Sequence, residues 1–285
     1  MKTINLSLLT VLSFVLLYSC GERAQNKETA PEPKAKIESK VPIYDTNDPK
    51  TILASIEYAH GGWGNLWKKH DVEYEYNYNY PTEGKSDVSI ERYIFGTEES
   101  FAKYSRHEIN VMPNAEGEVI QFFDGNQTVI YHNGKEIQDA THLDMADFLR
   151  RTNYYWFTMP YKLNDKAAKA KYLGKEEYNG IAYDKVEVSY DAAITGKEQN
   201  DVYIILVNPK TKLIDRFYFS IPFFGVDDPV IAANYEYEKI EGQLIATKRS
   251  YFLPSEAGYP EEPGTVQTLT KIKFNNGFTV DNIME

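Results

Sequence analysis

The sequence predicts a mainly β protein: a single large, strongly bent antiparallel sheet with a few helices. Three observations lead to this fold class. Many short segments alternate between apolar and polar side chains, turn-forming pairs such as Asp-Gly and Asn-Gly separate them, and only two segments have apolar residues at helical spacing. Because short turns join neighbouring strands, consecutive hairpins favour an antiparallel sheet over a parallel one.

The first helix is expected directly before the strands. Pro49 suits a first helical turn, and Gly61 and Gly62 suit a helix end. Apolar side chains recur at helical spacing between them and continue past the glycines to Trp63 and Trp67. This segment therefore predicts a helix with one apolar face, followed by a short aromatic extension.

The first strand has the clearest period-two pattern in the chain. In Asp71–Tyr80, the side chains of Tyr74, Tyr76 and Tyr78 share one face, while acidic residues and asparagines occupy the other. Tyrosine is abundant overall, with 23 among 285 residues, and it suits half-buried sheet faces and ligand-facing walls. The pattern predicts a strand with one face in water.

Further runs of the same kind bring the total to about eleven or twelve strands. A second helix is expected around residues 143–149, with Phe148 on its apolar side and Trp156 in the aromatic run that continues to Pro160. The other predicted strands are Val88–Phe95, Tyr104–Met112, Glu118–Phe123, Thr128–His132, Ala170–Tyr178, Ile181–Tyr190, Asp201–Val207, Leu213–Ile221, Ile231–Ile240, Leu244–Leu253 and Thr265–Asn275.

Residues 1–19 have the features of a signal peptide. Lys2 supplies the positive charge, and Leu6–Leu17 form an apolar stretch too short to span a bilayer comfortably. The segment Leu17-Tyr18-Ser19-Cys20 resembles the bacterial lipobox, which implies cleavage before Cys20 and transfer of diacylglycerol to its sulfur. Cys20 is the only cysteine, so internal disulfides and cysteine metal clusters are excluded.

The rest of the chain divides into a tether and one domain. Residues 20–47 are charged, contain two prolines and have few large apolar side chains, which is typical of a disordered segment. Residues 48–285 form the folded domain. We expect a lipoprotein of the cell envelope, held on the outer membrane through acyl chains such as palmitate and facing the periplasm or the cell surface. The net charge of −11 disfavours nucleic acid as a partner.

Short motifs within this organisation resemble the LolA/LolB superfamily of outer-membrane lipoprotein-sorting proteins. They are Phe123-Asp124-Gly125-Asn126, Val207-Asn208-Pro209-Lys210-Thr211 and the turn at Glu241-Gly242. His60-Gly61-Gly62 after the first helix is similar to an uncharacterised set of LolA-like lipoproteins. The resemblance covers most of residues 48–280. It implies an unclosed β-barrel, apolar on its concave side and plugged by helices, that binds acyl chains or other lipids.

The candidate ligand-binding residues follow from the apolar faces and from two strand arginines that could hold a lipid headgroup. Alternatively, the aromatic residues simply form a packed core, and the arginines point into solvent. The apolar segment Phe217–Gly225 is either a buried strand end, which we favour, or a lip facing a ligand or membrane. The candidates are Trp63, Trp67, Tyr74, Tyr76, Tyr78, Arg92, Arg106, Phe148 and Trp156.

The sequence offers little that predicts catalysis. None of its five histidines has metal-ligand spacing, and no nucleophile elbow, phosphate-binding loop or dinucleotide fingerprint is present. We therefore expect no metal, no cofactor and no enzymatic activity. His60 is the one histidine beside two glycines; it indicates either a hydrolase site or, more simply, a histidine at a helix C-terminus.

The main hypothesis is a monomeric, membrane-anchored protein that binds an apolar ligand, such as a lipid or its acyl chains, in the half-barrel. Strands with one apolar face outnumber the helices that could cover them, so part of that face is left for a ligand. The alternative is an envelope scaffold or protein-interaction module with a filled core. The sequence does not identify a protein partner.

Overall fold

The computed structural model describes residues 41–196 and 199–285. The predicted signal peptide, Cys20 and the tether up to residue 40 lie outside the described residues. Within the described part, the helical elements are α1 (Pro49–Ala59), α2 (Trp63–Trp67), α3 (Ala140–Lys162), α4 (Ala192–Thr195) and the 3-10 turn η1 (Pro222–Phe224). None of the helices there is both long enough and apolar enough to cross a membrane.

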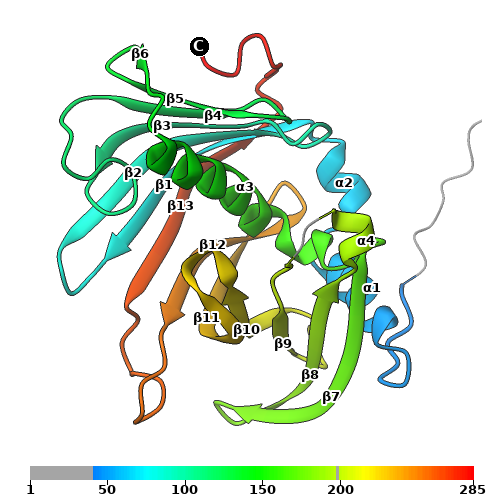
Figure 1. Ribbon diagram of the computed structural model, residues 1–285. Coiled ribbons are helices and arrows are strands. Elements are labelled where there is room, and N and C mark those ends of the chain that lie inside the picture. The colour runs from blue at the N-terminus through cyan, green and yellow to red at the C-terminus, as the bar shows by residue number, and fades with distance from the viewer. Residues whose placement is uncertain (1–40, 197–198) are drawn as a thin grey trace, which may run out of the picture. The chain divides into compact units, whose positions relative to one another are not determined.

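Thirteen strands form one sheet (Figure 1). They are β1 (Asp71–Tyr80), β2 (Lys85–Ile94), β3 (Ser100–His107), β4 (Val119–Phe123), β5 (Thr128–His132), β6 (Lys135–Glu136), β7 (Ala168–Tyr178), β8 (Ile181–Tyr190), β9 (Tyr203–Val207), β10 (Ile214–Ile221), β11 (Val226–Ile240), β12 (Gln243–Phe252) and β13 (Thr265–Phe274). β6, which is only two residues long, has no counterpart among the predicted strands.

The sheet runs in the order β6-β5-β4-β3-β2-β1-β13-β12-β11-β10-β9-β8-β7. Every pair consists of consecutive strands except β1 with β13, and all pairs are antiparallel. The edge strands β6 and β7 do not pair with each other, so the curved sheet stays open (Figure 1). The predicted fold class, a mainly β half-barrel with helices on its concave side, is confirmed.

The alternation in β1 places its tyrosines as the sequence predicts. Tyr74 and Tyr76 are buried on the concave side, whereas Glu75 on the other face pairs with Lys271 of β13 at 2.6 Å. Tyr78 is half-buried and packs against the same cluster. Burial of one face only explains why polar and aromatic residues alternate strictly in this strand.

Helix α3 lies along the concave side of the sheet (Figure 1). Asp139 caps it by accepting a hydrogen bond from the backbone N–H of His142 at 3.1 Å, which satisfies a free donor of the first turn. The side chains of Arg150 and Trp156, both on this helix, are buried. Because α3 extends to Lys162, the predicted helix around residues 143–149 and the aromatic run after it are one element.

The core consists of three clusters on the concave side and a small one on the convex side. The largest joins α1, α3 and β7 to β12; the second joins α2, α3, β1, β2, β12 and β13; the third lies between α3 and β3 to β5. On the convex side, Phe101 and Phe122 are covered by Ile283 of the C-terminal segment. Most of the concave face is thus packed, and aromatic rings supply much of the packing.

The folded part extends ahead of residue 48. Tyr44 packs against the largest cluster, and its hydroxyl donates a hydrogen bond of 2.7 Å to Oδ2 of Asp184 on β8. Asp184 also accepts hydrogen bonds from Tyr172 and Lys175, both at 3.0 Å. Residues 41–47, which the sequence analysis assigns to the tether, therefore run along the domain in the described structure.

Candidate functional site

A cavity of about 540 Å³ opens beside α3, on the side of the helix that faces β9 and β10. Its volume lies within the range of about 300–1,000 Å³ that is usual for small-molecule sites. Its walls come from the last four turns of α3, the segment that contains α4, and the ends of β9 and β10. This cavity therefore lies on one flank of the helix.

Aromatic and aliphatic side chains form most of the cavity wall. Trp156 and Phe219 are buried and meet edge to face, with ring centroids 5.0 Å apart. Of the predicted ligand-binding residues, the structure places Phe148 and Trp156 here. The other apolar or aromatic wall residues are Phe123, Tyr154, Tyr155, Ala167, Tyr190, Ile194, Tyr203 and Ile221.

Three tyrosines give this wall neutral polar groups. The hydroxyls of Tyr155 and Tyr190 lie 2.8 Å apart, and the rings of Tyr155 and Tyr203 stack at 5.7 Å. Burial raises the pKa of all three hydroxyls, because a phenolate loses its hydration there. These groups therefore stay protonated and can hydrogen-bond a ligand without adding charge to the cavity.

Three charged residues of the cavity wall, Arg151, Lys162 and Glu98, are held in ion pairs. Arg151 bonds Asp147 at 2.8 Å one turn earlier on α3, and its guanidinium lies 4.2 Å from the ring centre of Phe123. Lys162 pairs with Glu98 from the β2–β3 turn. Arg151 is half-exposed, so its pair with Asp147 adds little stability. The charges mark a polar rim around an apolar interior.

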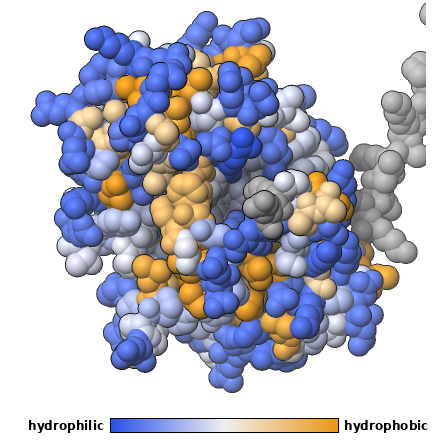
Figure 2. Space-filling view, viewed as in Figure 1, coloured by the Kyte–Doolittle hydropathy of each residue, from blue (hydrophilic) through white to orange (hydrophobic). Residues whose placement is uncertain are grey.

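An apolar lip adjoins this rim. Phe223 and Phe224 of η1 are 48% and 52% exposed, and Phe148 of α3 stacks on Phe223 at 4.2 Å. Figure 2 shows hydrophobic side chains gathered near the middle of this face, next to a hollow. The segment Phe217–Gly225 is thus divided: its strand part is buried, as favoured, whereas Phe223 and Phe224 form a partly exposed lip.

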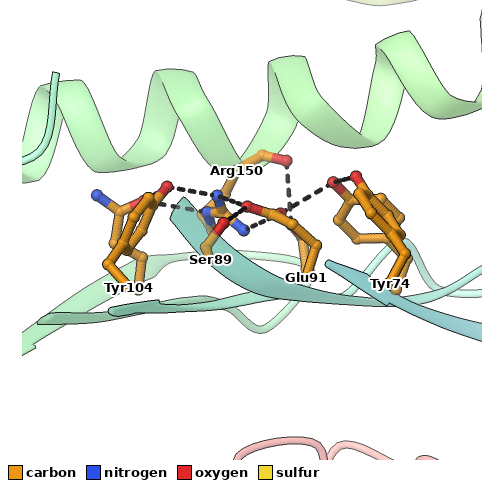
Figure 3. A network of polar contacts seen from close by, with 8 residues as sticks. Tyr74, Ser89, Glu91, Tyr104 and Arg150 are labelled. Carbon is orange, nitrogen blue, oxygen red and sulfur yellow. Dashed lines mark hydrogen bonds and ion pairs between the residues drawn. The ribbon is translucent and has the colours of Figure 1, made fainter. Parts of the chain in front are cut away.

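A buried polar network lies under α3, away from the cavity (Figure 3). The guanidinium of Arg150 donates two hydrogen bonds to the Glu91 carboxylate of β2, at 2.7 and 3.0 Å, and both side chains are fully buried. Ser89 and Tyr93 also donate to Glu91, and Nε of Arg150 donates to Gln121. Burial of this ion pair is tolerable because its polar groups are so fully hydrogen-bonded.

The remaining predicted aromatic residues lie in the core around β1. Trp63 and Trp67 stack on each other at 4.1 Å and pack, half-buried, against the second cluster. Tyr74 stacks on Phe157 of α3 at 5.4 Å, and Tyr76 is buried in the same cluster. These residues do not line the cavity of about 540 Å³. The alternative of a packed aromatic core describes this part of the molecule.

The two predicted arginines do not line the cavity either. Arg92 lies on the convex face, where it bonds Glu73 at 2.8 Å and the C-terminal carbonyl oxygens of Ile283 and Glu285. Arg106 is exposed on β3 and donates to the hydroxyl of Ser86 at 3.3 Å. Strand parity places Arg92 on the face opposite Glu91 and Tyr93. Arg106 has the parity of the buried Tyr104, but a β-bulge between them shifts the register, so Arg106 pairs with Val88 and points outward.

His60 is fully buried at the C-terminal end of α1. Its Nδ1 lies 2.7 Å from the carbonyl oxygen of Ile56, and its ring packs edge to face against Tyr237. Gly61 follows because a Cβ there would come within 2.7 Å of the carbonyl oxygen of Gly242. The His-Gly-Gly motif therefore fits α1 against the β11–β12 turn, and the geometry supports a structural histidine rather than a hydrolase site.

The cavity residues that the sequence analysis missed are mainly Tyr155, Tyr190, Tyr203 and Phe219. Tyr155 belongs to the aromatic run after the predicted helix, and the other three belong to predicted strands. Their apolar character could be predicted, but not their place beside a gap. Within residues 41–196 and 199–285, no cluster of three or more histidine or acidic side chains could hold a metal ion.

Most of the cavity wall lies in a segment that matches a protein-family model. A model of a family of unknown function, DUF6503, matches residues 115–229. All the residues of the cavity wall except Glu98 fall in this range. Comparison with curated proteins gives no match.

The fold is similar to those of several solved structures. A DUF1329 family protein from Desulfovibrio piger is 15% identical with a TM-score of 0.50, over 82% of this chain and 95% of that one. An outer membrane lipoprotein-sorting protein domain from Vibrio parahaemolyticus is 9% identical (TM-score 0.48, 82% and 95% covered). A LolA superfamily protein from Nitrosomonas europaea is 13% identical (TM-score 0.41, 74% and 92% covered). The likeness to the DUF1329 family protein, at a TM-score of 0.50, is one of fold.

Proposed function

We propose that this protein is an envelope lipoprotein that binds an apolar ligand, namely the acyl chain of a lipid, in the cavity beside α3. The observation that carries the proposal is a gap of about 540 Å³ in an otherwise packed concave face. Each methylene transferred from water into such a site contributes about 0.8 kcal/mol, so a long acyl chain gains much from it. The chain acts by binding, without a catalytic step.

The lip supports an apolar ligand that enters from the surface. Phe223 and Phe224 expose about half of their area next to Phe148, which belongs to the cavity wall. Adjacent exposed aromatic rings of this kind often mark a ligand or membrane contact. An acyl chain that leaves a bilayer would meet these rings first.

The predicted lipid anchor specifies where in the cell envelope the ligand is bound. In the proposal, diacylglycerol on Cys20 holds the protein on the outer membrane, facing the periplasm or the cell surface, because two acyl chains make anchoring stable. A fixed anchor suits a receptor or a local lipid handler better than a diffusing carrier. The lipoprotein-sorting names of the similar structures are compatible with this class of ligand.

A cavity-filling substitution tests the proposal. Thr152 lines the cavity on α3, so Thr152→Trp should displace part of a bound chain. Loss of about two buried methylenes costs roughly 1.6 kcal/mol and weakens binding about tenfold or more. The measurement is the affinity of the purified protein for a fluorescent acyl probe.

The matched control is the same substitution at an exposed position of the same helix, Thr141→Trp. It should leave the affinity within about twofold of the unsubstituted protein, which corresponds to roughly 0.4 kcal/mol. Equal affinities of the two tryptophan variants would place the probe elsewhere and contradict the proposal.

The second candidate function is an envelope scaffold with a filled core. The three packed clusters of the concave side favour it, since they fill most of that face in the described residues. This function predicts no uptake of the acyl probe, together with a reproducible protein partner in crosslinking. Saturable uptake that Thr152→Trp removes would exclude it.

A further inference from the structure

Arg249 is a buried cation without a counterion. It lies on β12 between the two largest core clusters, is 1% exposed, and contacts the ring of Tyr235 with 5.5 Å between guanidinium carbon and ring centre. Only its Nη1 has a hydrogen-bond partner, Oε1 of Gln267, at 3.5 Å. Its Nε and Nη2 are buried and have none.

The two unpartnered nitrogens belong to the same edge of the guanidinium. Nε–H and one N–H of Nη2 point in parallel, which is the spacing that a carboxylate accepts with its two oxygens. Arg150 shows what a satisfied buried arginine looks like in this fold, because Glu91 accepts two of its hydrogen bonds. A buried charge without such a partner is strongly unfavourable.

The surroundings do not provide the missing negative charge. No aspartate or glutamate of residues 41–196 and 199–285 forms an ion pair with Arg249. Its neighbours are Tyr76, Tyr235 and Tyr251, and burial raises the pKa of each, so they remain neutral. The hydroxyl of Tyr76 is itself buried and unpartnered, which leaves a further donor.

Tyr251 links Arg249 to the wall of the cavity. Trp156 and Phe219 line the cavity, and both contact Tyr251, with ring centroids 6.4 and 5.9 Å apart. The Tyr251 hydroxyl donates to Oε1 of Gln267, the same atom that accepts from Arg249. Tyr251 thus contacts the cavity wall and shares its hydrogen-bond acceptor with Arg249.

We propose that Arg249 and Tyr76 form an internal carboxylate site, which binds the head of a fatty acid whose chain occupies the cavity. This inference rests on the proposed function and specifies its ligand class. The carboxylate accepts from Nε and Nη2 of Arg249 and from the Tyr76 hydroxyl, after the rings of Trp156, Phe219 and Tyr251 move apart. The hydrocarbon tail points toward the lip at Phe223.

The experiment compares hexadecanoate with hexadecan-1-ol, which has the same chain length and no charge, on the purified full-length protein. Titration calorimetry should show hexadecanoate binding at least about tenfold more tightly than the alcohol, since charge-assisted bidentate hydrogen bonds are the strong ones. Arg249→Met should remove this preference and leave alcohol binding within about threefold.

Two further variants keep the outcome interpretable. Tyr76→Phe preserves the ring and should weaken the binding of hexadecanoate but not that of hexadecan-1-ol. This variant therefore tests the carboxylate site even if Arg249→Met does not fold. Arg216→Met is the matched control: Arg216 is also a buried arginine, but it lies on the convex side and bonds Asn234 at 2.7 Å. It should leave the preference for hexadecanoate unchanged.

The possible results separate the two proposals. Equal binding of acid and alcohol, unaffected by Arg249→Met, would overturn the carboxylate site and leave the lipid-binding function intact. Failure of both ligands to bind would overturn both. Thermal stabilisation by acetate that depends on Arg249 and matches that by hexadecanoate would support the carboxylate site and assign it to a small carboxylate instead of a fatty acid.

Discussion

At the scale of single residues, His60 shows what a motif in a sequence can and cannot predict. Its position at the end of a helix beside two glycines is readable from the chain, and so are the two possible roles. Only the structure shows that the ring is fully buried and that Gly61 is required by the close approach of Gly242. The contact joins residues far apart in the sequence, so no local pattern reveals it.

His60 should make the stability of the protein depend on pH. Burial lowers its pKa to about 4, whereas an unfolded histidine titrates near 6.5. Between these values the unfolded chain binds more protons, so the free energy of unfolding falls as pH falls from about 6.5 to 4, by up to roughly 3 kcal/mol. Urea unfolding at pH 7 and pH 4.5 measures the change.

The comparison of two variants isolates this effect from other titrating groups. His60→Gln should flatten the dependence between the two pH values, while His142→Gln at the start of α3 should retain it. If the stability of His60→Gln falls with pH as steeply as that of the unsubstituted protein, then a different group is responsible.

The lack of a carboxylate partner for Arg249 could not be predicted from the sequence. Its strand, β12, was predicted with bounds within one residue of those observed, and strand parity gives two possible faces. Whether a carboxylate faces the guanidinium depends on β13 and β1, which join β12 through pairing of distant segments. The missing partner is visible only once those strands are in register.

At the scale of elements, the strands were easier to predict than the long helix. β1, β5 and β8 have the predicted bounds, because alternation and turn residues mark both ends of each. α3 was predicted only in part, since its buried residues occupy more than one side of the helix and lack a single apolar stripe. More than one side of α3 is buried because the helix lies along the concave side of the sheet.

The ion pair between Arg150 and Glu91 is expected to hold α3 against β2. Glu91→Gln leaves the buried guanidinium without its counterion, and such a loss typically lowers the free energy of unfolding by about 3–5 kcal/mol. The measurement is the midpoint and slope of chemical unfolding.

Replacing both partners separates the cost of an orphaned charge from the value of the pair. Glu91→Leu combined with Arg150→Met removes both charges, so it should be less destabilising than Glu91→Gln, although Ser89 and Tyr93 also lose an acceptor. A double variant less stable than the single one would show that the pair itself stabilises the fold strongly.

At the scale of the whole molecule, the open sheet, the helix along its concave side and one remaining gap define the functional account. The sequence predicted the first two, from hairpin order, from the excess of one-sided strands and from the resemblance. It left open whether the aromatic residues pack or line a cavity. Both occur: the residues around β1 pack, and those beside α3 line the gap. The volumes of side chains from four strands and α3 determine the gap, and no single segment encodes it.

The central claim is that the cavity beside α3 holds a lipid acyl chain, and native mass spectrometry tests it most directly. The protein, extracted from its membrane in a mild detergent, should carry one non-covalent lipid-sized adduct that collisional activation releases, in addition to any covalent anchor. The same adduct should be lost from Thr152→Trp and kept by Thr141→Trp. Protein that is free of adduct and does not take up added acyl lipid, or equal adducts in both variants, would contradict the account.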